Sequence, residues 1–474
     1  MGGAETPCHP YTPDVSSTRR LLATLAALSA CMAFAGSVPT ATALGAPAVL
    51  RDPGVPSYVV HLRTVGVGHA WTGAESVTFT NLGATGLGEI WLRLWSNGVM
   101  GCGGVGGHDA IRVFRVMGGT ADAPTVNCTA LRIQLDAPLP PGGRTTVGMR
   151  LAIDVPKRDD RFGYRPGLTL LGTALPTLAV RDDQGWHATE PFVDLGESFY
   201  SIAGTYRVTL SAPRGVATPA TGFAVAHHDT RSGRSVTTYA ASSVRDFAWA
   251  AGRLATVTGQ VGATRVVVSY QRPGVTRGEA LDALATARGA MRTYGRDFGA
   301  YPYREMDVVL PASASFGGME YPQIVFTNPY AINHEVAHQW WYGVVGDDEF
   351  HEPWLDEGFA TWTERLAPGG ATPWRNCGTP TWPSPAARLT NDMNYWDAHR
   401  AQYGAVVYDI GGCMLADLAH RFGMATFLGV LRSYAQAHWF GVTRSSEFRD
   451  AIDAAALADG VSLPAGYWSA WRVD

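Results

Sequence analysis

The sequence predicts an α+β protein of more than one domain, with a β-rich N-terminal half and a mostly helical C-terminal half. Short runs that alternate apolar and polar residues fill the chain from about 55 to 250, and a period of two is typical of half-buried strands. After about 252, apolar residues recur at helical spacing behind helix-capping sequences. A chain of 474 residues is also longer than a domain with a single hydrophobic core usually is. We therefore expect a leader at 1–43, a β-rich domain at 44–251 and a second domain at 252–474.

The expected leader has the pattern of an export signal. A polar segment ends at Arg19-Arg20, an apolar run extends from Leu21 to Gly36, and Ala41-Thr42-Ala43 matches an A-x-A cleavage site. The apolar run is too short for a transmembrane anchor. The sequence Leu28-Ser29-Ala30-Cys31 resembles a lipoprotein box, which makes a lipid anchor at Cys31 the alternative. We thus expect a secreted or cell-surface protein without a transmembrane segment.

Five segments of the N-terminal half have the alternation of strands. β-branched and aromatic residues favour strands, and turn-forming residues such as Pro140-Pro141-Gly142-Gly143 separate the segments. The five segments are 58–62, 90–95, 111–114, 131–135 and 206–210.

Helices are predicted in the second half from their caps and their apolar spacing. Thr276 and Glu279 form a capping box before a helix that would place Leu281, Leu284 and Met291 on one side. Further on, Asn328-Pro329 is expected to cap a second helix. An apolar helix is expected from Cys413 to Phe422.

Charge and composition argue against a nucleic-acid partner and indicate the kind of genome that encodes the chain. The net charge is -4, the pI is about 6.4, and no run of basic residues is longer than the pair Arg19-Arg20, so nucleic-acid binding has no electrostatic support. Lys157 is the only lysine, so nearly all of the 37 basic residues are arginine. Together with abundant Gly and Ala, this bias suggests a GC-rich bacterial genome.

Four cysteines lie beyond the expected leader and allow three pairings. Pairing Cys102 with Cys128 and Cys377 with Cys413 keeps each bridge inside one predicted domain. None of the four has the spacing of a metal site, so we expect structural bridges or buried thiols.

The most specific pattern in the chain is His334-Glu335-Val336-Ala337-His338. If residues 329–343 are helical, the two histidines lie one turn apart on one face and both imidazoles can bind one ion. Glu335 projects beside that face. There it can take a proton from a metal-bound water, whose pKa the ion lowers.

Glu357 is the candidate third ligand. It follows His338 by 19 positions (357 minus 338), which leaves room for one helix to end and a second to return antiparallel. Two histidines, one glutamate and an open position are typical of a catalytic rather than a structural zinc site. We expect one Zn²⁺ ion on His334, His338 and Glu357. Asp356 could accept the other ring N–H of a zinc histidine.

Three blocks together resemble the gluzincin zinc aminopeptidases, the family of aminopeptidase N. They are Phe316–Pro322 (FGGMEYP), His334–Trp341 (HEVAHQWW) and Trp354–Trp362 (WLDEGFATW). The resemblance is to a short, secreted bacterial member. It implies a saddle-like β domain leading into a thermolysin-like catalytic domain, and peptide substrates with a free N-terminus.

The resemblance also implies substrate-binding residues. The family's Gly-x-Met-Glu motif binds the substrate amine through its Glu, here Glu320, and Tyr321 stands where most members have Asn. Gly317 and Gly318 have no side chains to block a peptide, which could pair with their backbone as an added strand, and Met319 completes this binding segment. Nearby candidates for a second acidic amine-binding group are Glu190 and Glu197, although each is more typical of solvated surface.

Members of this family use a tyrosine to stabilise the oxyanion, and the best match is Tyr408 in Tyr408–Gly412. A phenol stays protonated near neutral pH and donates one directed hydrogen bond. Tyr403 lies close in sequence and is the alternative, and a tyrosine that only packs at a helix start is the other interpretation of Tyr408.

Other functions fit the same motifs less closely. A zinc endopeptidase or an epoxide-hydrolase-like enzyme could use the same metal. A catalytically silent peptide-binding protein would be expected to have a damaged site, yet every essential residue type of the zinc site is present. The sequence leaves side-chain preference and oligomeric state open.

Overall fold

The computed structural model describes residues 55–370, 377–378 and 380–473. The expected leader and its alternative lipid anchor at Cys31 lie outside the described residues. No helix within the described ranges has both the length and the apolar character needed to cross a bilayer.

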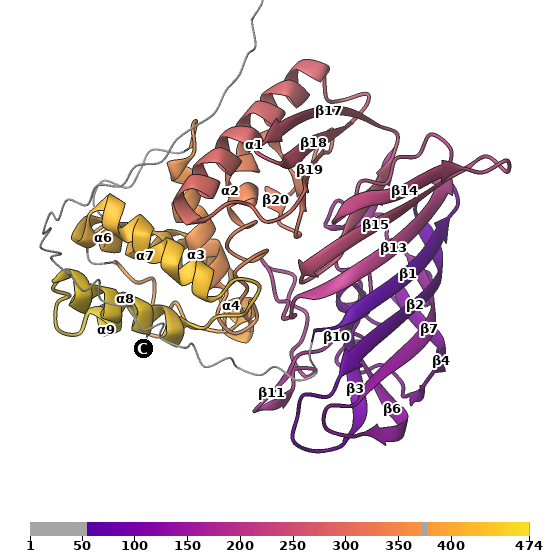
Figure 1. The fold of residues 1–474 in the computed structure, drawn as a ribbon, viewed down its shortest axis with the longest axis horizontal. Helices are drawn as coiled ribbons and strands as arrows, with labels where there is room; N and C mark the ends of the chain where they lie inside the picture. Colours follow the sequence, from indigo (N-terminus) through magenta and orange to yellow (C-terminus); the bar gives the residue numbers. More distant parts are fainter. Residues whose placement is uncertain (1–54, 371–376, 379, 474) are drawn as a thin grey trace, which may run out of the picture. The chain divides into compact units, whose positions relative to one another are not determined.

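The N-terminal region is built on a seven-stranded sheet (Figure 1). Its strand order is β14-β15-β13-β1-β2-β7-β4, in which β1 pairs parallel with β13 and antiparallel with β2. Alternation along β1 places Val60 and Leu62 in the core and Val59 and His61 in solvent, as the period of two requires. The strands are β1 Ser57–Thr64, β2 Ala70–Thr80, β4 Ile111–Met117, β7 Arg144–Asp154, β13 Gly204–Pro213, β14 Phe223–Asp229 and β15 Arg234–Val244.

Three smaller sheets complete the β-rich region. One has the order β10-β3-β6-β5, a second the order β16-β9-β8, and the third is the pair β11-β12. Their strands are β3 Leu87–Arg93, β5 Gly119–Ala121, β6 Ala130–Leu139, β8 Phe162–Arg165, β9 Leu168–Leu171, β10 Thr177–Leu178, β11 Arg181–Asp182, β12 Gly185–Trp186 and β16 Trp249–Gly252. A short 3₁₀ turn, η1, covers Trp95–Asn97.

The five predicted strand segments fall on β1, β3, β4, β6 and β13, and the predicted turn at 140–143 joins β6 to β7. The prediction for 90–95 was two residues too long, because β3 ends at Arg93. Trp95 instead begins η1, and the Arg93 guanidinium lies 3.6 Å over its ring.

A five-stranded sheet follows the β-rich region, and the prediction of helices after 252 omitted it. Its order is β17-β18-β19-β21-β20, with β20 at the edge. Seven of the eight side chains of β18 are buried. A short apolar run of this kind lacks the alternation that separates strand from helix. The strands are β17 Leu254–Val261, β18 Thr264–Gln271, β19 Glu305–Leu310, β20 Gly318–Met319 and β21 Ile324–Thr327.

Helix α1, Arg277–Phe298, packs against β17 and β18 (Figure 1). The predicted capping box at Thr276 and Glu279 is present in full. Leu284 and Met291 are buried as expected, but Leu281 is 38 % exposed and does not belong to the buried face.

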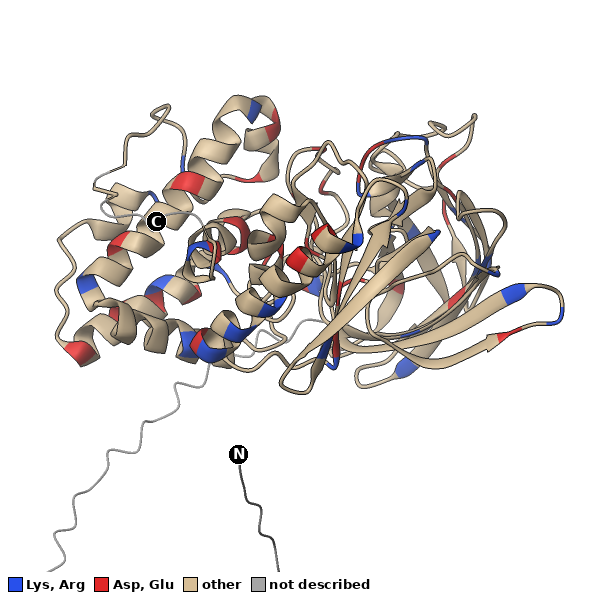
Figure 2. Ribbon diagram, turned by 90° about the horizontal axis from the view of Figure 1, so that it is seen from above, with Lys and Arg blue, Asp and Glu red and all other residues tan. Residues whose placement is uncertain are grey.

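The remaining helices form the C-terminal part, where α6 packs against both α3 and α7. Basic and acidic residues lie on both the strand-rich and the helical regions (Figure 2). The helices are α2 Ile332–Ala337, α3 Trp354–Thr363, α4 Met393–Ala398, α5 Arg400–Tyr403, α6 Gly411–Phe422, α7 Met424–Ala437, α8 Ser445–Asp459 and α9 Tyr467–Trp471, with 3₁₀ turns η2 Pro329–Ala331 and η3 Glu364–Leu366 and a π-helical turn η4 Gly404–Ile410.

Of the three possible cysteine pairings, the structure contains the one that keeps each bridge inside one half of the chain. Cys102 bonds Cys128 and Cys377 bonds Cys413, at sequence separations of 26 and 36. The second bridge ties the segment near 377 to helix α6. Each bridge closes a loop within one half of the chain.

Candidate metal centre and active site

Three side chains from two helices converge on one point. His334 Nε2 lies 3.1 Å from Glu357 Oε2, His338 Nε2 lies 3.3 Å from the same oxygen, and the two Nε2 atoms are 3.1 Å apart. A tetrahedral zinc ion with bonds of about 2.0–2.1 Å holds its ligand atoms about 3.3 Å apart. The spacing of these three atoms therefore fits one zinc ion.

The helix that carries the histidines is shorter than the expected 329–343. A 3₁₀ turn occupies Pro329–Ala331, and α2 ends at Ala337 with His338 as its C-cap. Asn328 precedes the turn, but its side chain makes no capping bond and donates instead to the Phe316 carbonyl. The histidines still share a face because His338 N–H donates to the His334 carbonyl at 3.2 Å, which closes one helical turn between them.

Each histidine has a second partner on its other ring nitrogen. His338 Nδ1 lies 3.2 Å from the Trp341 carbonyl, and His334 Nδ1 lies 3.3 Å from Glu364 Oε2. Such partners fix the tautomer and the ring orientation of metal-binding histidines. Asp356, the expected partner, accepts the Glu357 backbone N–H instead. Sequence reasoning missed Glu364, whose only signal was its place seven residues after Glu357, two turns further along the same helical path.

Glu335 is buried beside the two histidines. It is 3 % exposed, its Oε2 has no hydrogen-bond partner among the described residues, and burial raises its pKa to about 8. A carboxylate with a pKa near neutrality is suited to accept and return a proton.

The backbone of β20 packs directly on this carboxylate. A Cβ atom built on Gly318 would lie 2.2 Å from Glu335 Cδ, whereas one on Gly317 would have no neighbour closer than 3.7 Å. Because β20 is an edge strand, it can accept an added strand, as expected. Met319 does not face this space, because its side chain is 8 % exposed and packs in an apolar cluster with Leu168 and Phe326.

Two further carboxylates join the centre. Glu320, Glu197 and Glu357 each offer an oxygen within 4.8 Å of the others, and all three are buried. Burial, and then the neighbouring carboxylates, raise the pKa of Glu320 well above its ordinary value. Arg161 pairs with Glu197 at 2.6 Å. The site is thus a buried cluster of carboxylates beside the candidate metal ligands, with one arginine paired to it.

Of the two acidic candidates of the β-rich region, only one lies in this carboxylate cluster. Glu197 is 5 % exposed, so the expectation that it lies on solvated surface was wrong. Glu190 does not join this cluster; it pairs with His187 at 3.1 Å and with Arg93 at 3.4 Å.

Tyr408, rather than Tyr403, contacts the ligand set. The Tyr408 hydroxyl donates to Glu357 Oε1, and its ring stacks on His334 at 6.0 Å between centroids. Tyr408 lies in the π-helical turn η4, a distortion often found at functional sites. The Tyr403 hydroxyl is buried against Gly196 with no hydrogen-bond partner in the described chain. Burial, and then Glu357, raise the pKa of Tyr408 well above its ordinary value, so the hydroxyl keeps its proton.

Residues 328–463 match the model of the peptidase family M1 domain, a stretch that holds both histidines, Glu335, Glu357 and Tyr408. This stretch is thus similar to the peptidase family M1 domain. This confirms the resemblance seen in the sequence motifs.

Among curated proteins, the chain is 25% identical over 231 residues to aminopeptidase 2 of Candida albicans, covering 41% of this chain and 24% of that protein. It is 27% identical over 217 residues to leukotriene A-4 hydrolase of Xenopus laevis, covering 38% and 34%. A third, aminopeptidase N of Streptomyces lividans, is 26% identical over 185 residues, covering 32% and 22%. The chain thus spans only about a quarter to a third of these relatives.

The fold is that of a solved M1 zinc metallopeptidase. The crystal structure of the enzyme from Deinococcus radiodurans matches with a TM-score of 0.62 at 19% identity, and the match covers 88% of this chain and 93% of that one. The likeness therefore includes the β-rich region as well as the M1 domain, and it confirms the multidomain α+β prediction.

Proposed function

We propose that this protein is a zinc-dependent aminopeptidase that removes N-terminal residues from peptides. The observation that carries the proposal is the pair of buried carboxylates, Glu320 and Glu197, beside the candidate ligand Glu357. A metal-ligand set alone fits any zinc hydrolase. A buried cluster of carboxylates next to it suits a protonated α-amine, which would place the first peptide bond at the metal.

His334, His338 and Glu357 would hold one Zn²⁺, in keeping with the zinc metallopeptidases that the fold matches. When bound, zinc supplies a Lewis acid that polarises the scissile carbonyl and acidifies a water. Glu335 takes the proton of the attacking water and delivers it to the leaving amine. Tyr408 donates its hydroxyl hydrogen bond to the oxyanion that develops on the carbonyl oxygen.

Glu320 and Glu197 bind the substrate amine, while Arg161 holds the Glu197 carboxylate in place at 2.6 Å. The backbone of Gly317 and Gly318 pairs with the peptide main chain as an added strand on β20. A mutant of the Deinococcus radiodurans enzyme was solved with a Tyr-Ser-Ala substrate, and a mutant of a two-domain M1 zinc metallopeptidase was solved with L-arginine; both ligands present a free α-amine.

The location and the domain plan belong to the same proposal. Two disulfides are typical of an oxidising compartment, which supports a secreted or cell-surface bacterial enzyme exported through the leader at 1–43. Of the proposed domains, 44–251 would supply Glu197, and 252–474 would supply Glu320 together with the three metal ligands. Mass measurement of the mature N-terminus separates simple cleavage after Ala43 from a lipid anchor at Cys31.

The test compares unblocked and N-acetylated peptides in the wild type and in Glu320→Ala. We expect the wild type to prefer the free amine, and Glu320→Ala to lose at least tenfold in kcat/KM on unblocked substrates, about 1.4 kcal/mol or more. Residual cleavage of acetylated peptides should barely change, because they present no charged amine.

Other outcomes assign other functions. Equal cleavage of blocked and unblocked peptides by the wild type would indicate an endopeptidase, and the aminopeptidase proposal would then be wrong. Activity on an epoxide with none on peptides would place the chain with the epoxide-hydrolase-like alternative. Peptide binding without turnover at full zinc content would indicate a binding protein.

A further inference from the structure

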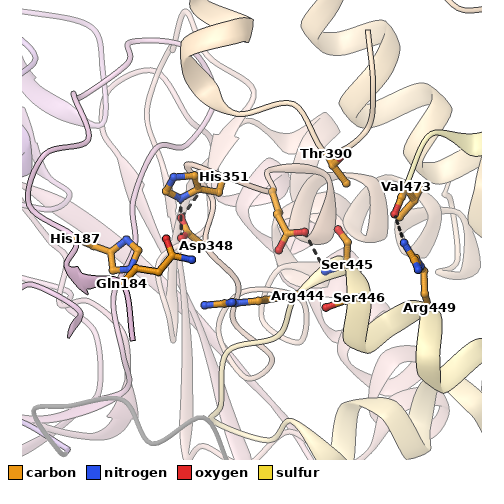
Figure 3. Close-up of a pocket in the computed structure, with 11 residues that line it drawn as sticks. Gln184, His187, Asp348, His351, Thr390, Arg444, Ser445, Ser446, Arg449 and Val473 are labelled. Atoms are coloured by element: carbon orange, nitrogen blue, oxygen red, sulfur yellow. Dashed lines mark hydrogen bonds and ion pairs between the residues drawn. The ribbon is translucent and has the colours of Figure 1, made fainter. Parts of the chain in front are cut away.

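A second cluster of metal-ligating side chains lies apart from the candidate active site. His187, Asp348 and His351 each offer one ligand atom within 4.8 Å of the others. They line a pocket of about 390 Å³ (Figure 3). The three gather at one end of the pocket, whereas Arg449 and Val473 lie at the other. None of the three belongs to the triad of His334, His338 and Glu357.

The cluster joins two parts of the chain that are far apart in sequence. His187 follows strand β12 in the β-rich region, and its imidazole is 9 % exposed. Asp348 and His351 lie in the segment between α2 and α3. His351 precedes Glu357 by six residues (357 minus 351). The cluster therefore includes part of the segment that leads into α3, the helix that carries this candidate ligand.

His187 faces a carboxylate on each side of its ring. Its Nε2 lies 3.0 Å from Asp182 Oδ2, and its Nδ1 lies 3.1 Å from Glu190 Oε1. Whichever nitrogen binds a metal ion, one carboxylate stands next to that nitrogen as a further oxygen ligand. The other then accepts from the remaining N–H, which is the usual support of a metal-binding histidine.

His351 completes the other side of the cluster. Its Nδ1 lies 2.8 Å from Asp348 Oδ2, and its ring centroid is 6.0 Å from that of His187. The His351 side chain is 43% exposed. A small rotation of this side chain can therefore bring the ligand atoms to the roughly 3.3 Å spacing of a tetrahedral zinc site, and the buried core need not move.

The charges around the cluster favour a cation. Arg93 pairs with Glu190 at 3.4 Å and Arg444 with Asp182 at 3.2 Å. Asp348 pairs with His351, and no arginine or lysine lies within 4.0 Å of its carboxylate in the described chain. Burial lowers the pKa of His187, but Glu190 and Asp182 outweigh it and the pKa is raised. The hydrogen bond to Asp348 raises the pKa of His351.

We propose that His187, Asp348 and His351 form a second zinc site, which ties the segment 182–190 of the β-rich region to the segment that leads into α3. Imidazole with carboxylate is a donor set that suits Zn²⁺. The proposal does not rest on the aminopeptidase function, because it involves none of the candidate catalytic residues.

The experiment measures zinc per chain in the full-length protein after dialysis against buffered Zn²⁺. Four variants are compared with the wild type, with circular dichroism to verify folding: His351→Gln, Asp348→Asn, the double substitution His334→Ala with His338→Ala, and the control His228→Gln, an exposed histidine on β14. We expect two zinc ions in the wild type and in the control, and one in each of the others.

The outcomes separate the two sites. If the wild type binds one zinc ion and the His334/His338 variant binds none, the second site is refuted while the catalytic site stands. If the His334/His338 variant keeps every ion of the wild type while His351→Gln loses one, the second site stands and the catalytic assignment fails. Retention of two ions by both His351→Gln and Asp348→Asn would overturn the second site.

Discussion

One added methyl group should disable the proposed general base without touching the metal ligands. A Cβ atom on Gly318 would lie 2.2 Å from both Glu335 Cδ and Oε1, against an ordinary contact distance of at least 3.4 Å. In Gly318→Ala the Glu335 carboxylate must therefore move by about 1.2 Å (3.4 minus 2.2). Displacement of a catalytic group by about 1 Å can cost a hundredfold in rate. We expect kcat to fall about a hundredfold, or about 2.7 kcal/mol in the activation barrier.

The assay is steady-state hydrolysis of an unblocked aminoacyl chromogenic substrate, with zinc content and circular dichroism measured on the same samples. Zinc content should stay at the wild-type level because the three atoms nearest to the added Cβ all belong to Glu335, which is not a proposed ligand. Gly317→Ala is the matched control: its nearest neighbour would be 3.7 Å away, an ordinary contact. Its kcat should change less than threefold, well below the hundredfold loss expected from a 1 Å displacement, because Glu335 stays in place. Any effect of the added methyl on the peptide that pairs with this strand should appear as a higher KM.

A double variant tests whether the effect passes through Glu335. Two changes that act on the same group are not additive, so Gly318→Ala should cost little more in a Glu335→Gln background. The reasoning is refuted if Gly318→Ala keeps more than half of the wild-type kcat. It is also refuted if Gly317→Ala loses as much, or if the two effects simply multiply.

Three further changes test other parts of the site and fold. Glu335→Gln should retain zinc and lose several orders of magnitude in turnover; metal analysis and kcat decide this, and a folded but zinc-free variant would contradict it. Tyr408→Phe should lower kcat about a hundredfold with little change in KM. Tyr403→Phe should stay close to the wild type, because the Tyr403 hydroxyl has no hydrogen-bond partner in the described chain. The reverse ranking of the two variants would exchange the roles of the two tyrosines. Glu75→Gln should raise Tm at pH 8 more than at pH 5. Glu75 is 2 % exposed, neither of its oxygens has a hydrogen-bond partner among the residues that the structure describes, and burial raises its pKa well above 4.5. The wild type therefore loses stability as pH rises from 4.5 to the folded-state pKa, about 1.4 kcal/mol for each pH unit between these two values. A Tm difference that does not change with pH would show that Glu75 ionises normally.

The features that could be predicted from sequence alone are those that depend on the spacing of residues close together in the chain. Two histidines four residues apart meet whenever one helical turn forms, so they converge even though α2 ends at Ala337 rather than at 343. Alternation placed the five strand segments because a half-buried strand has a period of two. The sequence left three cysteine pairings open, and the structure contains the one that keeps each bridge within one half of the chain.

Tertiary structure decided the parts that depend on the path of the chain. Glu197 reaches Glu320 across 123 positions (320 minus 197), and no local pattern marks such a contact. The sheet that contains β18 was missed because a strand buried on both faces has no alternation. Sequence favoured Tyr408 over Tyr403 by motif alone, and only the folded chain shows why the two differ: Tyr408, inside the π-helical turn, directs its hydroxyl to Glu357. Sequence supplies the residue types and their local spacing, whereas the meeting of distant segments depends on how their apolar faces pack.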